Sequence, residues 1–167
     1  MRNIFILFII FLLYSCENSP SLIKKELQNF NYKVFDVIKY ENSSIKQLMG
    51  KKTILYVFDG SCSECIGHFV NFQKNKLEND ITIPCLYIVN SCDIIPLNFY
   101  LDRNKIELGV TDYLVQDSLD IFHTMEPDEF SGNQIFIIDN DLIYQLCSYP
   151  FKDVTSKNEF IKMCKNQ

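Results

Sequence analysis

The amino-acid sequence predicts one α/β domain with a central mixed sheet. Residues 52–58 (KTILYVF) are almost continuously apolar, which is typical of a strand covered on both faces in the middle of such a sheet. The next segment, from Cys62 to Leu77, carries apolar residues at helical spacing. Residues 133–151 contain two apolar runs joined by a tight polar turn at Asn140 and Asp141, which predicts an antiparallel hairpin.

The elements expected before the buried strand are short. Residues 22–30 have apolar side chains at helical spacing, so we expect a helix where the folded domain begins. Residues 32–40 (YKVFDVIKY) alternate and are rich in β-branched and aromatic side chains, which predicts a strand. A short helix is expected in residues 42–51, with Ser43 or Ser44 as its cap and Gly50 as its end.

A second buried strand is predicted after the long helix. It comprises residues 80–91 (DITIPCLYIVNS), and we place it at an edge of the sheet because Pro84 cannot donate a ladder hydrogen bond. The remaining elements are expected in this order: a helix in residues 93–106, a short strand at 111–117, a short helix at 117–125, the hairpin, and a final helix in residues 155–165.

The N-terminal residues are typical of an export signal. One positive charge at Arg2 precedes an unbroken apolar run from Ile4 to Leu13. This run is shorter than the about 20 residues that a membrane-spanning helix needs, so it is interpreted as the apolar part of a signal peptide. The alternatives are an uncleaved membrane anchor and a plain signal peptide, and each of the three places the domain outside the cytoplasm.

The residues that end this run resemble a bacterial lipoprotein signal. Leu13-Tyr14-Ser15-Cys16 is similar to the lipobox, in which the cysteine is acylated and becomes the first residue of the mature chain. The resemblance implies a signal peptide in residues 1–15, a lipidated Cys16 and polar tether in residues 16–21, and a domain in residues 22–167. The membrane is then a partner through the lipid anchor, and the protein is expected in the cell envelope.

The composition argues against a nucleic-acid partner but does not decide how the cysteines are paired. The chain has a formal net charge of −5 and no cluster of basic residues, so we expect no nucleic-acid partner. Its seven cysteines are many for 167 residues, and an exported protein meets an oxidising compartment. Sequence alone does not decide how the six cysteines beyond Cys16 are paired.

Two of these cysteines lie three residues apart where the buried strand becomes a helix. Cys62 and Cys65 share one face of the helix, so a disulfide between them needs little backbone movement. The helix N-terminus offers free N–H groups and positive dipole charge, which stabilise a thiolate. We therefore expect Cys62 to be the nucleophile and Cys65 the resolving thiol, with no metal or organic cofactor. An inert disulfide and a metal site, with His68 or His123 as a further ligand, are the alternatives.

The order of elements resembles the thioredoxin fold. "ILYVFDGSCSEC" is similar to the strand and C-x-x-C of this family, and "NQIFIIDND" is similar to its later strand and turn. The strand and helix between Leu101 and Met125 resemble the βα insertion of the TlpA/ResA group of membrane-tethered proteins. The resemblance implies a thiol-disulfide oxidoreductase that exchanges disulfides with partner proteins through Cys62 and Cys65.

Three positions depart from the family pattern. Ser61 replaces the usual Trp, Tyr56 stands where many thioredoxins have a buried Asp, and Asn133 takes the place of the cis-proline. The departures at Tyr56 and Asn133 point to the alternative function, a redox-inactive cell-envelope protein that binds or assists a partner. Glu64, between the two cysteines, is expected to oppose a Cys62 thiolate and to make the couple less oxidising.

The other cysteines have separate expectations. Cys92 ends the second buried strand and is a candidate third active thiol, whereas Cys85 is expected in the core. Cys147 and Cys164 are candidates for a structural bridge.

Overall fold

Six strands of the computed structural model form one mixed sheet. The described residues are 23–27, 51–119, 133–139, 142–146 and 149–165. The strand order is β1-β6-β5-β2-β3-β4, and its parallel part is β2, β3 and β4, whereas β5, β6 and β1 complete it by antiparallel pairing. The strands are β1 (Ile23–Leu27), β2 (Thr53–Asp59), β3 (Cys85–Asn90), β4 (Asp112–Asp117), β5 (Gln134–Asp139) and β6 (Leu142–Leu146).

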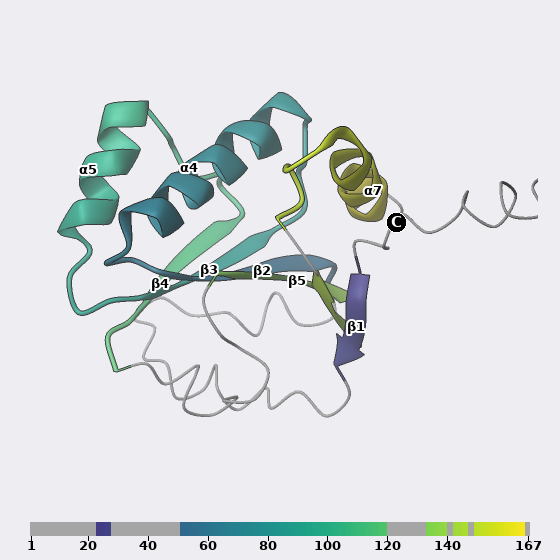
Figure 1. Ribbon diagram of the computed structural model, residues 1–167, viewed down its shortest axis with the longest axis horizontal. Helices are drawn as coiled ribbons and strands as arrows, with labels where there is room; N and C mark the ends of the chain where they lie inside the picture. Colours follow the sequence, from purple (N-terminus) through teal and green to yellow (C-terminus); the bar gives the residue numbers. More distant parts are fainter. Residues whose placement is uncertain (1–22, 28–50, 120–132, 140–141, 147–148, 166–167) are drawn as a thin grey trace, which may run out of the picture.

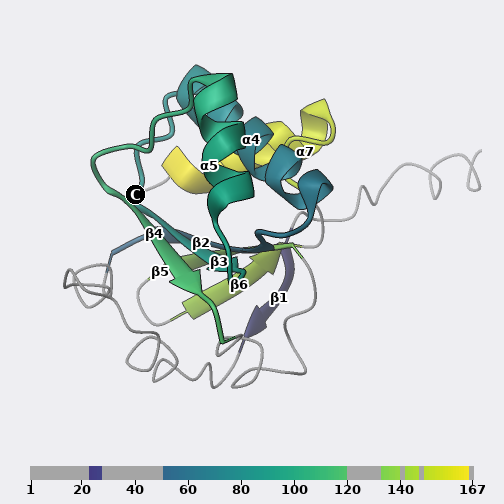
Figure 2. The same ribbon diagram turned by 90° about the vertical axis from the view of Figure 1, so that its left-hand side faces the viewer.

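Three described helices lie on one face of this sheet. Figures 1 and 2 show α4 across the middle of the sheet, with α5 and α7 to its two sides. Their bounds are Ser63–Glu78 for α4, Ile95–Asn104 for α5 and Val154–Lys165 for α7. None of the helices in the described segments is long and apolar enough to cross a membrane.

The core lies between α4 and the middle of the sheet. Every residue of β2 from Thr53 to Phe58 is buried, which explains its continuous apolar sequence. Ring contacts join the strand to the helix: the Phe58 and Phe69 rings are stacked with centroids 4.5 Å apart, and Tyr56 contacts Phe69 and Phe72 edge-on. Such contacts add to the burial of large apolar surfaces and fix α4 on the sheet.

Most elements predicted from the sequence are confirmed. The buried strand, the long helix after it, the helix at Pro96, the strand at 111–117, the hairpin and the final helix all begin within about two residues of their expected positions. The second buried strand, expected in residues 80–91, is also present, but it begins five residues later, at Cys85. The predicted mixed sheet with a C-terminal hairpin is therefore correct for the described residues. Of the βα insertion expected before the hairpin, the strand is confirmed as β4.

Two predictions were wrong. Residues 22–30 were expected to be helical, but Ile23–Leu27 is β1, which pairs with β6 and extends the sheet. A helix this short gains little stability from its own hydrogen bonds, whereas strand pairing satisfies the backbone groups on the open side of β6. The strand after Pro84 was placed at an edge, but β3 lies between β2 and β4. Pro84 precedes the strand, so no ladder hydrogen bond is lost, and its carbonyl accepts one from the Ile54 N–H at 2.9 Å.

Several predictions fall outside the described residues. They are the signal peptide in residues 1–15, the tether with Cys16, the strand at 32–40, the helix before residue 51, the helix at 117–125 beyond Leu119, and the turn at Asn140 and Asp141.

Candidate active site

The chain leaves β2 through a tight turn at Asp59, Gly60 and Ser61. The Asp59 carboxylate accepts hydrogen bonds from the Ser61 N–H at 2.7 Å and the Ser61 hydroxyl at 2.6 Å. The Gly60 N–H donates to the Asn90 carbonyl at 3.0 Å, so the backbone here runs close against the end of β3. A Cβ on Gly60 would lie 2.5 Å from Val89 Cγ1, closer than real contacts allow. Glycine is therefore required for this turn, which directs the next residues into α4.

Cys62 is the N-cap residue of α4. Its backbone is extended, and its sulfur accepts a hydrogen bond from the Cys65 N–H at 3.3 Å. Ser, Thr, Asp or Asn usually accepts this bond, because the first N–H groups of a helix have no partner within the helix. Here a sulfur does so, and a thiolate would accept the bond more strongly than a thiol. Cys62 is half-buried, so part of the residue is exposed to solvent.

Cys65 lies in the first turn of α4 and is also a half-buried thiol. The pKa of Cys65 is raised to about 11, mainly by burial, and to a lesser extent by the hydrogen bond and charge of Cys62 and by the charge of Asp59. The side chain of Asn133, directly before β5, forms a hydrogen bond with Cys65 that lowers its pKa. The two thiols are therefore in different environments, and Cys65 keeps its proton at neutral pH.

A buried aromatic group lies beneath the cysteine pair. Tyr56 is 1% exposed, and its hydroxyl has no hydrogen-bond partner within the described part of the chain. Burial is the main reason that the pKa of Tyr56 is raised, and the charges of Tyr149 and Cys65 contribute. Tyr149 packs its ring against His68 of α4 and donates a hydrogen bond to the His68 carbonyl at 3.2 Å.

The three other described cysteines, Cys85, Cys92 and Cys164, have environments different from that of this pair. Cys85 is buried in the core as expected, and Cys164 is also buried, whereas Cys147 lies outside the described residues, so their predicted bridge remains a prediction. Cys92 is exposed, and its sulfur lies 3.4 Å from the Ser118 carbonyl, which follows β4. The described contact of the Cys92 sulfur is therefore with the chain that follows β4.

Of the two histidines considered as metal ligands, the structure describes only His68. His68 is half-exposed on α4, 3.9 Å from the Glu64 carboxylate, and His123 lies outside the described residues. Among the residues that the structure describes, no three His, Cys, Asp or Glu side chains come together as a metal site would require.

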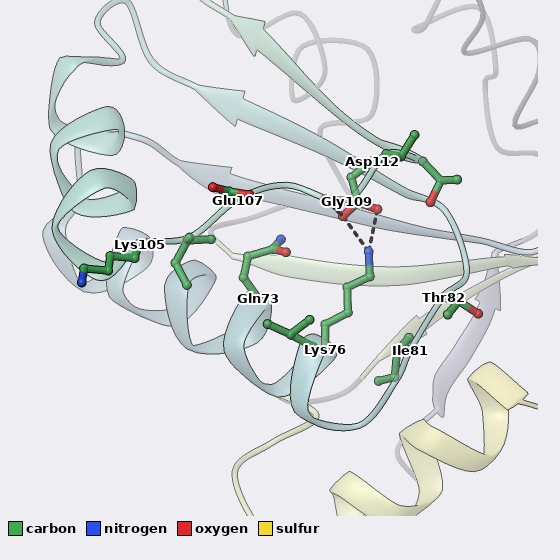
Figure 3. Close-up of a pocket in the computed structure, with 12 residues that line it drawn as sticks. Gln73, Lys76, Ile81, Thr82, Lys105, Glu107, Gly109 and Asp112 are labelled. Carbon is green, nitrogen blue, oxygen red and sulfur yellow. Dashed lines mark hydrogen bonds and ion pairs between the residues drawn. The ribbon is translucent and has the colours of Figure 1, made fainter.

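A second polar cluster lies near the other end of α4. Lys76 is 7% exposed, and its ammonium contacts both carboxylate oxygens of Asp112, at 2.5 and 2.6 Å. The Gly109 N–H donates to the same carboxylate at 3.1 Å. Figure 3 shows this ion pair in the wall of a pocket of about 350 Å³, between α4 and the chain that leads into β4. Lys76 is eleven residues beyond Cys65, which corresponds to about 16 Å along the helix, so this pocket is not part of the cysteine site.

Sequence reasoning identified the cysteine pair but missed several of its neighbours. The contact of Tyr149 with α4 joins residues 81 positions apart, and no local pattern indicates it. Gly60 was available as a signal, since a glycine between a buried strand and a helix often marks a close backbone approach.

The sequence matches no protein-family model, and no curated protein is significantly similar to it. Solved structures do resemble it. A secreted disulfide oxidoreductase of Mycobacterium tuberculosis, homologous to DsbE of E. coli, has a TM-score of 0.50 at 11% identity, covering 71% of this chain and 84% of that one. DsbF of Mycobacterium tuberculosis has a TM-score of 0.52 at 12% identity, with the same coverage.

A third similar structure covers more of the chain. The thioredoxin domain of a thiol-disulfide oxidoreductase from Bacteroides vulgatus has a TM-score of 0.51 at 13% identity, covering 87% of this chain and 99% of that one. At these identities the similarity concerns the fold. The chain therefore has a thioredoxin-like α/β fold, as the sequence predicted.

Proposed function

We propose that this protein is a thiol-disulfide oxidoreductase that acts through Cys62 and Cys65. The observation that carries the proposal is the hydrogen bond from the Cys65 N–H to the Cys62 sulfur at the start of α4. This bond and the helix dipole favour negative charge on Cys62, which is only half-buried. Cys65 is held as a thiol until it is needed, since its pKa is raised to about 11.

The proposed exchange has two steps. The Cys62 thiolate attacks one sulfur of a partner disulfide, and a mixed disulfide forms as the other partner sulfur leaves and takes a proton from solvent. Cys65 then loses its proton and attacks the Cys62 sulfur, which releases the second partner sulfur, again to be protonated. The partner gains two electrons and two protons, and the protein is left with a Cys62–Cys65 disulfide. Oxidation of a partner dithiol is the same sequence in reverse.

The proposed location is the cell envelope, facing an extracytoplasmic compartment. Residues 1–15 would direct export, and a lipid on Cys16 would tether the domain to the membrane. The partners would then be protein thiols or disulfides of that compartment. One of the similar structures is described as a secreted disulfide oxidoreductase, which agrees with this location.

A redox titration tests the proposal. The full chain, purified in detergent, would be equilibrated with mixtures of reduced and oxidised dithiothreitol, and each cysteine would be alkylated and identified by peptide mass. We expect a reversible Cys62–Cys65 disulfide, with Cys62 alkylated faster than Cys65 at neutral pH. A Cys62→Ser variant should lose both mixed-disulfide formation and the internal disulfide, whereas Cys85→Ser should keep them. A pair that stays oxidised or unreactive across the titration would contradict the proposal and favour the redox-inactive binding protein.

A further inference from the structure

The Tyr56 hydroxyl is a buried donor that the fold leaves unused. The side chain is 1% exposed, and its hydroxyl has no hydrogen-bond partner in the described segments. A buried hydroxyl without a partner is unfavourable, because the group gives up its bonds to water on folding. A phenylalanine would fill the same space without this cost, so the packing of the core does not explain the hydroxyl.

The position of the ring places this donor on the side of α4 that carries Cys65. Cys65, Phe69 and Phe72 have spacings of four and three residues and therefore follow one stripe of the helix. The Tyr56 ring packs edge-on against the last two of these, with centroids 5.9 and 5.2 Å away. The ionisable groups that act on the hydroxyl are Tyr149 and Cys65 itself.

We infer that the Tyr56 hydroxyl donates a hydrogen bond to the Cys65 thiolate as this sulfur attacks the mixed disulfide on Cys62. The inference rests on the proposed function and deepens it by naming the group that stabilises the second nucleophile. A thiolate is a stronger acceptor than a thiol, so the bond strengthens when the charge forms. An interaction that is stronger in the transition state than in the resting thiol speeds the step.

The proton balance of the step is simple. Cys65 is half-buried, so its proton passes to solvent, and the leaving partner sulfur takes a proton from solvent. Tyr56 keeps its own proton throughout, because burial raises its pKa. It therefore acts as a donor and not as an acid, unlike a carboxylate at the same position, which would accept the proton of Cys65.

Other groups near Tyr56 and Cys65 also affect the pKa values of these two side chains. Cys62 and Asp59 raise the pKa of Cys65, the Asn133 side chain lowers it, and Tyr149 acts on Tyr56. In the mixed disulfide Cys62 carries no charge, so its opposition to the Cys65 thiolate is absent when the second step occurs. Donors near Cys65 then have a direct effect on how readily it ionises.

The test is a comparison of two Tyr→Phe variants in the full chain. Tyr56→Phe removes the proposed donor, and Tyr87→Phe removes another buried hydroxyl, on β3 directly opposite Tyr56 in the sheet register. Each protein is mixed with dithiodipyridine, quenched in acid at set times, and analysed by peptide mass. Formation of the mixed disulfide on Cys62 and its conversion to the Cys62–Cys65 disulfide are followed separately across pH.

Tyr56→Phe should leave the first step unchanged and slow the second. Loss of one charge-assisted hydrogen bond should move the midpoint of the second-step pH profile upward by about one unit. Below that midpoint the rate should fall about threefold, since the more basic thiolate is also more nucleophilic and partly offsets its lower population. Tyr87→Phe should alter neither the midpoint nor the rate.

Two results would count against these ideas, and they are distinguishable. A Tyr56→Phe profile that coincides with the native and Tyr87→Phe profiles would overturn the role of the hydroxyl while the proposed function stands. If no Cys62–Cys65 disulfide forms in the native chain, the proposed function fails and the inference with it. Unfolding in urea checks the fold of both variants, and Tyr56→Phe should be at least as stable as the native chain because it loses a buried hydroxyl without a partner among the described residues.

Discussion

The two ends of α4 use similar side chains for different purposes. At its start are two half-buried cysteines, Cys62 and Cys65. The hydroxyl of the nearby Tyr56 has no hydrogen-bond partner among the described residues. Near its end, a fully buried Cys85 lies beside Lys76 and Asp112, which already neutralise each other. Burial raises the pKa of both Cys65 and Cys85, to about 11 and about 12. The difference is access, since a partner sulfur can reach the first region and not the second.

This contrast separates reactivity from stability. The first region has polar groups that are not fully satisfied, which is typical of a site that changes its charge during a reaction. In the second region the charges hold the chain before β4 against α4, as Figure 3 shows. Changes at the first region should therefore alter exchange chemistry, and changes at the second should alter the free energy of unfolding.

The largest expected effect is at the buried ion pair. Asp112→Asn leaves the Lys76 ammonium buried opposite a neutral amide, and removal of one partner of a buried pair typically costs about 3 to 5 kcal/mol. Urea unfolding of the reduced protein should show this loss, while the redox midpoint of Cys62 and Cys65 stays as in the native chain. A double variant, Lys76→Met with Asp112→Leu, should recover most of the stability, because no charge is left unpaired. A cost below about 1 kcal/mol for Asp112→Asn would show that the pair behaves as an exposed one.

An intermediate effect is expected from the pH dependence of stability. Burial, ahead of any nearby charge, raises the pKa of Cys85 from 9.0 to about 12. Above about pH 9 the unfolded chain loses the proton of this thiol, whereas the folded chain keeps it. The free energy of unfolding therefore falls as pH rises from there toward 12, by about 1.4 kcal/mol per pH unit for this one group.

Replacement of the thiol isolates its contribution. Urea unfolding of Cys85→Val between about pH 9 and pH 10 should show a slope shallower than the native one by roughly that amount. The control is Ile83→Val, a change in the same buried region that removes no ionisable group and should keep the native slope. Equal slopes for Cys85→Val and the native chain would mean that Cys85 ionises alike in the folded and unfolded states.

The first region was largely predictable from the sequence because its parts are close in the chain. Cys62 and Cys65 follow a strand whose apolar run identifies it, so their place at a helix N-terminus could be derived. Asn133 and Tyr149 contact α4 only because the tertiary fold brings the start of β5 and the chain before α7 next to this helix. The spacing of residues in the sequence does not indicate these contacts. The role of Tyr56 was judged from a family pattern, whereas its unpaired hydroxyl becomes visible only in the packed core.

In the second region the burial of Cys85 was predicted, but the ion pair was not. A lysine near the end of an amphipathic helix is usually exposed, and an aspartate at the start of a strand is typical of the turn that leads into it. Lys76 and Asp112 are 36 residues apart, and they meet because β4 is placed next to β3 on the side covered by α4 and α5. The error on residues 22–30 has a similar origin, because the open side of β6 decides the structure of Ile23–Leu27.

The smallest expected effect compares the same charge change at both ends of the helix. Glu64 is 85% exposed in the first turn of α4, and its carboxylate should disfavour a thiolate on Cys62. Glu64→Gln should therefore make the couple more oxidising, because the reduced form with its thiolate becomes more stable. An exposed charge near a helix end is worth a few tenths of a kcal/mol, which corresponds to a rise in midpoint of about 10 mV for a two-electron couple.

Glu78→Gln is the matched control, since Glu78 is the last residue of α4, is exposed, and loses the same charge far from the cysteines. Its midpoint should not move. Both titrations belong at low ionic strength, because salt screens exposed charges. An unchanged or lower midpoint in Glu64→Gln would remove the opposing role of Glu64, and equal shifts in both variants would indicate an effect of net charge rather than of position.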